Sequence, residues 1–188
     1  MTNLSKAREE PSKMLTSSRQ LHNPHSTMIQ YKFAKFLITD QPTRQNMDLF
    51  IKECHSYHVR DLVRVCEPEY DTDDLEKAGI EVLDWLFDDG SAPPESIINM
   101  WHDLVKSRFL LSTSEDTCVA VHCKAGLGRA PALVAISLIE MGLPYDQAIE
   151  LIREKRKGAF NAKQIQFLKN YRPKRKFKMH SSDKCRMI

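Results

Sequence analysis

The segment from Val119 to Met141 constrains the fold more than any other part of the sequence. It starts with a short apolar run, Val119–Val121, continues through a loop with two glycines, and ends in the stretch Arg129–Met141, which is apolar on most sides. A short apolar run of this kind is typical of a buried strand, and a helix that is apolar all round is typical of a buried position. The sequence therefore predicts a strand, a loop and a central helix in direct succession.

Strand-like and helix-like segments alternate along most of the chain. The expected strands are Tyr31–Thr39, Val59–Val65, Ile80–Leu83 and Val119–Val121, and the expected helices follow Thr43, surround Leu75, begin at Pro93, and cover Arg129–Met141, Tyr145–Lys157 and Ala162–Tyr171. This alternation favours an α/β fold of three layers, with a central, mostly parallel sheet flanked by helices. Ligands of such sheets bind beyond the carboxyl ends of the strands, which is where the loop after Val121 is expected.

That loop carries the residues expected to do chemistry. It contains Cys123, then Lys124, Ala125, Gly126, Leu127 and Gly128, and then Arg129. Glycines allow successive N–H groups to turn inward, a helix N-terminus attracts anions, and a guanidinium matches phosphate oxygens. In such positive surroundings the pKa of a thiol falls from about 8.5 to roughly 3.5–7.5. We therefore expect Cys123 to be a nucleophile and residues 124–129 to bind a phosphate group.

A thiolate that attacks a phosphate ester needs an acid to protonate the leaving oxygen. Asp88 and Asp89 stand between Phe87 and Gly90, ahead of a double proline. Aspartates in such a position usually cap a helix or face solvent. Upstream of the cysteine loop, however, they make Asp89 the leading candidate for a general acid.

Positive charge is concentrated at the C-terminal end of the chain. Residues 153–188 hold thirteen Lys or Arg residues against two acids, a local net charge of +11, so the rest of the chain carries −8 of the total charge of +3. Such an end suits an anionic surface, either a membrane or a nucleic acid. Few aromatic residues are interleaved with the basic ones, so no nucleic-acid partner is expected. Cys185-Arg186-Met187-Ile188 fits a prenylation signal loosely, because Arg186 is not aliphatic.

The segment from about Tyr31 to Pro173 resembles the phosphatases of regenerating liver, also called type IVA protein tyrosine phosphatases. The resemblance rests on the cysteine loop through Ala130-Pro131 and on the segments Lys35-Phe36-Leu37-Ile38-Thr39, Val63-Arg64-Val65-Cys66-Glu67, Val82-Leu83-Asp84-Trp85, Phe87-Asp88-Asp89-Gly90 and Gly158-Ala159-Phe160-Asn161. It implies a dual-specificity-phosphatase fold without a metal ion or cofactor. It also implies Cys123 as nucleophile, Arg129 as phosphate binder, Asp89 as general acid, and Cys66 as a thiol that forms a reversible disulfide with Cys123.

Ala130 stands where most related phosphatases carry Ser or Thr, whose hydroxyl helps the thiolate leave the phosphoenzyme. The resemblance therefore implies a cysteinyl-phosphate intermediate with slow turnover. Two alternatives to a protein tyrosine phosphatase stay open. One is a binding regulator of cyclin M-type magnesium transporters, and the other is a phosphoinositide phosphatase, which is favoured only by Lys124 in place of a small apolar residue of the family.

The chain is expected to have three parts: a disordered extension over residues 1–27, a phosphatase domain over residues 28–172, and a polybasic tail over residues 173–188. Without an apolar run of 18 residues or a leading apolar segment, neither a transmembrane helix nor a signal peptide is expected. A prenyl group on Cys185, with the carboxyl methylation that follows it, would anchor the chain together with the basic tail. The expected location is the cytoplasmic face of plasma and endosomal membranes, with a cytosolic or nuclear pool if the chain is unprenylated. A homo-oligomer is a further expectation.

Overall fold

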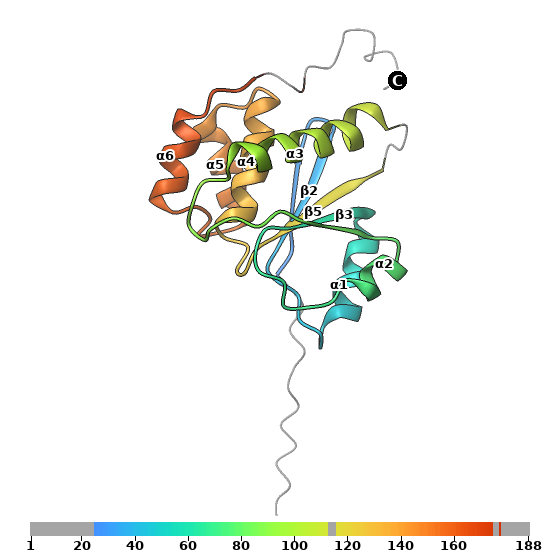
Figure 1. Cartoon of the computed structure of the whole chain (residues 1–188). Coiled ribbons are helices and arrows are strands. Elements are labelled where there is room, and N and C mark those ends of the chain that lie inside the picture. Colours follow the sequence, from blue (N-terminus) through green and yellow to red (C-terminus); the bar gives the residue numbers. More distant parts are fainter. Residues whose placement is uncertain (1–24, 113–115, 175–176, 178–188) are drawn as a thin grey trace, which may run out of the picture.

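The computed structural model describes residues 25–112, 116–174 and 177 and contains one five-stranded sheet between two layers of helices (Figure 1). The strands are β1 (Thr27–Tyr31), β2 (Ala34–Thr39), β3 (Val59–Arg64), β4 (Glu81–Asp84) and β5 (Cys118–His122). Their order in the sheet is β1-β2-β5-β3-β4. Only β1 pairs antiparallel with its neighbour, and the other pairs are parallel. The predicted mostly parallel sheet is confirmed.

Helices cover both faces of the sheet (Figure 1). The helices are α1 (Met47–Ser56), α2 (Asp73–Lys77), α3 (Glu95–Lys106), which runs on into a π-helical turn (Ser107–Leu111), α4 (Arg129–Glu140), α5 (Tyr145–Lys155) and α6 (Ala162–Asn170). The first two pack against one face of the sheet and the last four against the other. This is the three-layer arrangement that the sequence predicted.

Successive strand residues point to opposite layers, as expected from the period of two in a strand. In β2, Phe36 and Ile38 belong to the larger core, beneath α3 to α6, whereas Leu37 belongs to the smaller core, beneath α1 and α2. In β5, likewise, Val121 belongs to the larger core and Ala120 to the smaller one. Every residue of α4 is buried, which confirms the predicted central helix. The sheet and α4 therefore form a rigid base for the loop that joins them.

The first strand was predicted as one element over Tyr31–Thr39, and this was wrong. The structure has a hairpin there, with a turn at Lys32 and Phe33, where Lys32 takes a φ of 51°. The first strand of this hairpin, β1, lies at the edge of the sheet and buries few residues completely. The sequence of β1 therefore looks like part of the polar extension. Because β1 begins at Thr27, the boundary predicted between residues 27 and 28 falls inside this strand.

In the part of the chain that the structure describes, no helix is both long and apolar enough to cross a membrane. Residues 1–24 of the predicted extension and most of the predicted tail, including Cys185, lie outside the described residues.

Candidate active site

Cys123 follows β5 directly, and five residues separate it from the start of α4. The residue is only 3% exposed. Within the loop, Gly126 has a φ of 63°, in the left-handed region that favours glycine. A Cβ atom at this position would lie 2.1 Å from Nη2 of Arg156 and 2.5 Å from the carbonyl oxygen of Thr39. Conformation and space both require glycine here, and the loop is therefore tightly fixed.

Arg129 is the first residue of α4, and its buried guanidinium is held by two other segments. Nη1 donates hydrogen bonds of 3.1 Å to the carbonyl oxygens of Val65 and Phe87. Nε lies 3.0 Å from Oδ1 of Asp89, but the two are not aligned for a hydrogen bond, so this buried N–H is left without an acceptor among the described residues. Such a group is costly to bury unpaired. A bound oxyanion would satisfy it.

Asp89 lies at the mouth of the site, with its side chain 81% exposed. The loop that carries it is tied to the start of α6. Asn161 Nδ2 donates to the carbonyl oxygen of Gly90 at 2.9 Å, and Gln164 Nε2 donates to that of Ser91 at 3.2 Å. Asn161 and Gln164 also form the capping box of α6, which fixes both side chains. This helix therefore positions the acid-bearing loop beside the cysteine loop.

Arg156 is a structural residue that sequence reasoning missed. It is 2% exposed, and its guanidinium donates to the carbonyl oxygens of Gly126 at 2.5 Å and Ala125 at 3.1 Å. The same group reaches the carbonyl oxygen of His25 at 2.7 Å and Oγ1 of Thr27 at 3.0 Å. Arg156 thus fastens the cysteine loop to the start of β1. In the sequence it is one of three consecutive basic residues, and that run looks like a solvated surface.

An uncharged, hydrogen-bonded group directly precedes Cys123 in the chain. His122 is fully buried, with Nε2 2.5 Å from the hydroxyl oxygen of Tyr70 and Nδ1 3.8 Å from Sγ of Cys66. Burial lowers the pKa of His122 to about 4, so the ring is uncharged at neutral pH. Burial raises the pKa of Cys66 to about 11 against the opposing effect of the Arg129 cation. Cys66 therefore remains a thiol, and both it and Cys123 are free in this structure.

The remaining loop residues differ in exposure and charge. Lys124 is exposed and forms an ion pair with Glu69. Ala125 and Leu127 are also exposed, so two apolar side chains border the cysteine loop. Ala130 is fully buried in the first turn of α4 and places no hydroxyl there. The structure thus places Arg129, at the end of the cysteine loop, beside Asp89, and the catalytic roles of Cys123, Asp89 and Arg129 stay predictions.

Comparisons with known proteins identify the family. Residues 39–143 match a family model described as "Polymorphic toxin system, DSP-PTPase phosphatase". Over 161 residues the chain is 48% identical to the PRL-1 phosphatase of Drosophila melanogaster, covering 86% of this chain and 90% of that protein. It is 47% identical over 159 residues to human protein tyrosine phosphatase type IVA 3, covering 85% and 91% of the two chains. The chain belongs to the type IVA protein tyrosine phosphatases.

Solved structures agree with this family and fold. A protein tyrosine phosphatase from Leishmania major is 39% identical, with a TM-score of 0.72 over 78% of this chain and 98% of that chain. The kinase associated phosphatase is 18% identical, with a TM-score of 0.62 over 79% and 94% of the two chains, and at that identity it bears on the fold alone. The type IVA resemblance and the dual-specificity-phosphatase fold, both predicted from the sequence, are confirmed.

Proposed function

We propose that this type IVA phosphatase hydrolyses phosphotyrosine through a cysteinyl-phosphate intermediate on Cys123. The observation that carries the proposal is the buried guanidinium of Arg129, whose Nε lacks an acceptor among the described residues beside the cysteine loop. That cation and the N-terminus of α4 favour a bound anion. A phosphate held there lies within the loop that carries the nucleophile.

The proposed reaction has two displacements at phosphorus. In the first, Sγ of Cys123 attacks, the S–P bond forms, the P–O bond to tyrosine breaks, and Asp89 donates a proton to the leaving oxygen. In the second, water attacks the phosphorus, the S–P bond breaks, and the Asp89 carboxylate accepts a proton from the water. Arg129 and the loop N–H groups stabilise the negative charge of the oxygens in both steps.

Slow turnover is part of the proposal and is supported by the buried Ala130. A hydroxyl in the first turn of α4 could donate to the departing thiolate in the second step, but an alanine methyl group cannot. Breakdown of the phosphoenzyme then limits the rate. The intermediate is expected to accumulate after brief mixing with an aryl phosphate.

Intact-mass analysis of the protein after such mixing tests both the nucleophile and the intermediate. Wild-type protein should gain one phosphoryl group, and Cys123→Ser should gain none and lose aryl-phosphate turnover by roughly a thousandfold or more. The matched control is Cys118→Ser, which alters another buried cysteine at the start of β5 and should keep activity if it folds. Turnover at the wild-type rate in folded Cys123→Ser would refute the nucleophile assignment.

For the substrate class, the ion pair of Lys124 with Glu69 favours phosphotyrosine proteins over phosphoinositides. A lysine that is neutralised by a neighbouring carboxylate offers less attraction to a polyanionic headgroup. Lys124→Ala should therefore change activity on a phosphoinositide by no more than it changes activity on a phosphotyrosine peptide. A selective loss on the lipid would favour the phosphoinositide alternative.

A second candidate function is regulation of a cyclin M-type magnesium transporter by binding. This binding function is favoured by the same Ala130. A site that turns over its phosphorylated state slowly is also suited to a long-lived complex with a protein partner. Calorimetry with the purified cytosolic part of such a transporter tests it. Binding that inorganic phosphate weakens would place the contact at the active-site loop, and absence of binding would exclude this candidate.

We also propose that the chain is anchored at the cytoplasmic face of membranes by a prenyl group on Cys185 and by the basic tail. One lipid chain gives only marginal attachment, and a polybasic patch adds to it. Cell fractionation of Cys185→Ser tests the anchor, because this variant should move to the soluble fraction and keep aryl-phosphate activity. Wholly membrane-bound Cys185→Ser would contradict the proposal.

A further inference from the structure

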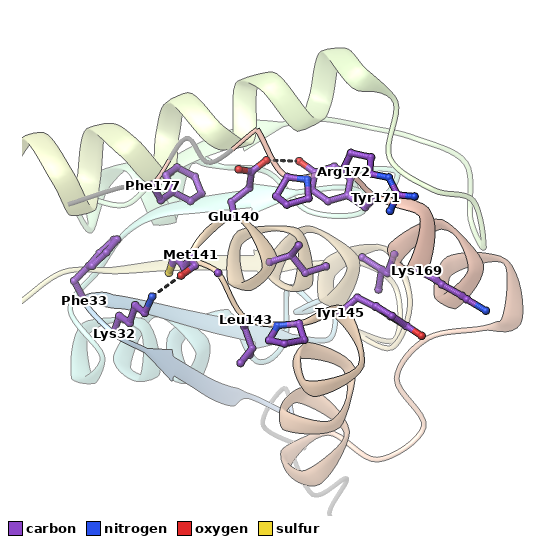
Figure 2. A pocket seen from close by; sticks show the side chains of 15 residues that line it. Lys32, Phe33, Glu140, Met141, Leu143, Tyr145, Lys169, Tyr171, Arg172 and Phe177 are labelled. Carbon is purple, nitrogen blue, oxygen red and sulfur yellow. Dashed lines mark hydrogen bonds between the residues drawn. The ribbon is translucent and has the colours of Figure 1, made fainter. Parts of the chain in front are cut away.

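A cavity of about 810 Å³ lies at the end of α4 away from the cysteine loop (Figure 2). It is open to solvent and is bordered by the turn between β1 and β2, the end of α4 with the turn that follows it, the end of α6, and the chain beyond α6. The twelve residues of α4 span about 18 Å at 1.5 Å per residue. The cavity is therefore a place distinct from the proposed active site, and nothing in the phosphatase reaction uses it.

Apolar side chains form much of the wall. They include Phe33 from the hairpin turn, Met141 and Leu143 after α4, Leu168 from α6, and Phe177 from the chain beyond it. A volume of this size falls in the range of roughly 300–1,000 Å³ that is usual for sites of small molecules. Hydrocarbon that moves from water into such surroundings is stabilised. The cavity thus suits an apolar ligand body.

Two cations stand at one end of this wall. Lys169 and Arg172 line the cavity and are exposed, and among the described residues neither has an ion-pair partner. Figure 2 shows them at the end away from Phe33 and Phe177. Two cations without an ion-pair partner among the described residues therefore stand at the end opposite Phe33 and Phe177.

The other charged groups of the wall already have partners. Lys32 donates through Nζ to the carbonyl oxygen of Met141 at 2.5 Å, at the end of α4. Glu140 accepts hydrogen bonds from the hydroxyl of Tyr171 at 2.7 Å and from the backbone N–H of Lys174 at 2.9 Å. Figure 2 shows the first of these Glu140 contacts and the Lys32 contact as dashed lines. With Lys32, Lys169 and Arg172 against the one carboxylate of Glu140, the charged groups that line the cavity are net positive.

We propose that this cavity binds a free, single-chain amphipathic anion of the fatty-carboxylate type. The hydrocarbon chain lies against the apolar wall, and the carboxylate lies at Lys169 and Arg172. A neutral hydrocarbon would leave these cations without a counter-charge, and a small polyanion would leave the apolar wall exposed to water. A carboxylate on a long chain matches both ends of the cavity.

Calorimetric titration of the full chain with oleate, kept below the concentration at which it forms micelles, tests the proposal. Oleate should bind with one-to-one stoichiometry and more tightly than oleyl alcohol, which has a similar chain but no charge. The double variant Lys169→Glu and Arg172→Glu should bind oleate about tenfold more weakly or worse, since exposed charge contacts are individually modest. Lys163→Glu is the matched control, because this exposed lysine also lies on α6 but does not line the cavity.

The position of the ligand is tested separately by methyl NMR. Oleate should shift the methyl signals of Met141 and Leu143, and Leu143→Trp, which fills space in the wall, should weaken binding in a folded protein. Absence of saturable binding, equal binding of oleyl alcohol, or equal binding to the charge-reversed double variant would overturn the proposal. It would also fail if phospholipid vesicles, and not free oleate, caused the shifts at Met141 and Leu143.

Discussion

Replacing Gly126 by alanine tests how tightly the cysteine loop is enclosed, and Gly79→Ala provides a matched comparison. Both glycines have a positive φ, 63° at Gly126 and 78° at Gly79, so each substitution costs about 1–2 kcal/mol of backbone strain. At Gly79 a Cβ atom meets nothing within 4 Å, whereas at Gly126 it lies 2.5 Å from the backbone oxygen of Thr39. Overpacking of this kind adds about 1–3 kcal/mol. The total at Gly126 is therefore about 2–5 kcal/mol.

Thermal unfolding and aryl-phosphate kinetics measure the two consequences. At roughly 2–4 °C per kcal/mol for a chain of this size, Gly79→Ala should lower Tm by about 2–8 °C and Gly126→Ala by about 4–20 °C. The kcat values should distinguish the two variants further, because a displacement of about 1 Å at a reacting group can lower the rate roughly a hundredfold. Gly79→Ala should keep its kcat. If folded Gly126→Ala matched Gly79→Ala in both Tm and kcat, the loop would not be enclosed as described.

Three further predictions concern the surroundings of Cys123. Ala130→Ser should raise kcat and reduce the phosphoenzyme seen by intact mass, and an unchanged kcat would show that its breakdown is not limiting. Dilute peroxide should convert Cys123 to a sulfenic acid, from which the Cys66 thiol displaces water to form a disulfide; peptide mapping that finds no such link would exclude the pair. Burial lowers the pKa of His122 to about 4 from an unfolded value near 6.5. The contribution of this residue to the free energy of unfolding is therefore fully present above pH 6.5. It should be lost as pH falls towards 4, by about 3 kcal/mol in all. In urea unfolding, the free energy of unfolding of the wild-type protein should fall more steeply over this pH range than that of folded His122→Gln. Equal slopes for the two proteins would contradict the lowered pKa of His122.

The sequence was informative where the signals are local. The strand, the glycine-containing loop and the buried helix that surround Cys123 lie within the 23 consecutive residues 118–140, and each part has its own pattern. Contacts between distant segments leave no such pattern. Arg156 is 131 residues from His25, and Asn161 is 71 residues from Gly90. No periodicity distinguishes a lysine or arginine that is buried by such contacts from its solvated neighbours in a basic run.

The connection between α5 and α6 explains why a motif outside the cysteine loop carries part of the family resemblance. Phe160 takes a φ of 68°, unusual for a residue with a side chain, and its N–H donates to the carbonyl oxygen of Leu127 at 2.7 Å. Arg156, four residues earlier, holds the other side of the same loop, and Asn161, one residue later, holds the acid-bearing loop. One short segment therefore contacts both loops that the proposed reaction uses. A change in this connection should disturb Cys123 and Asp89 together, although none of its residues is proposed to touch the substrate.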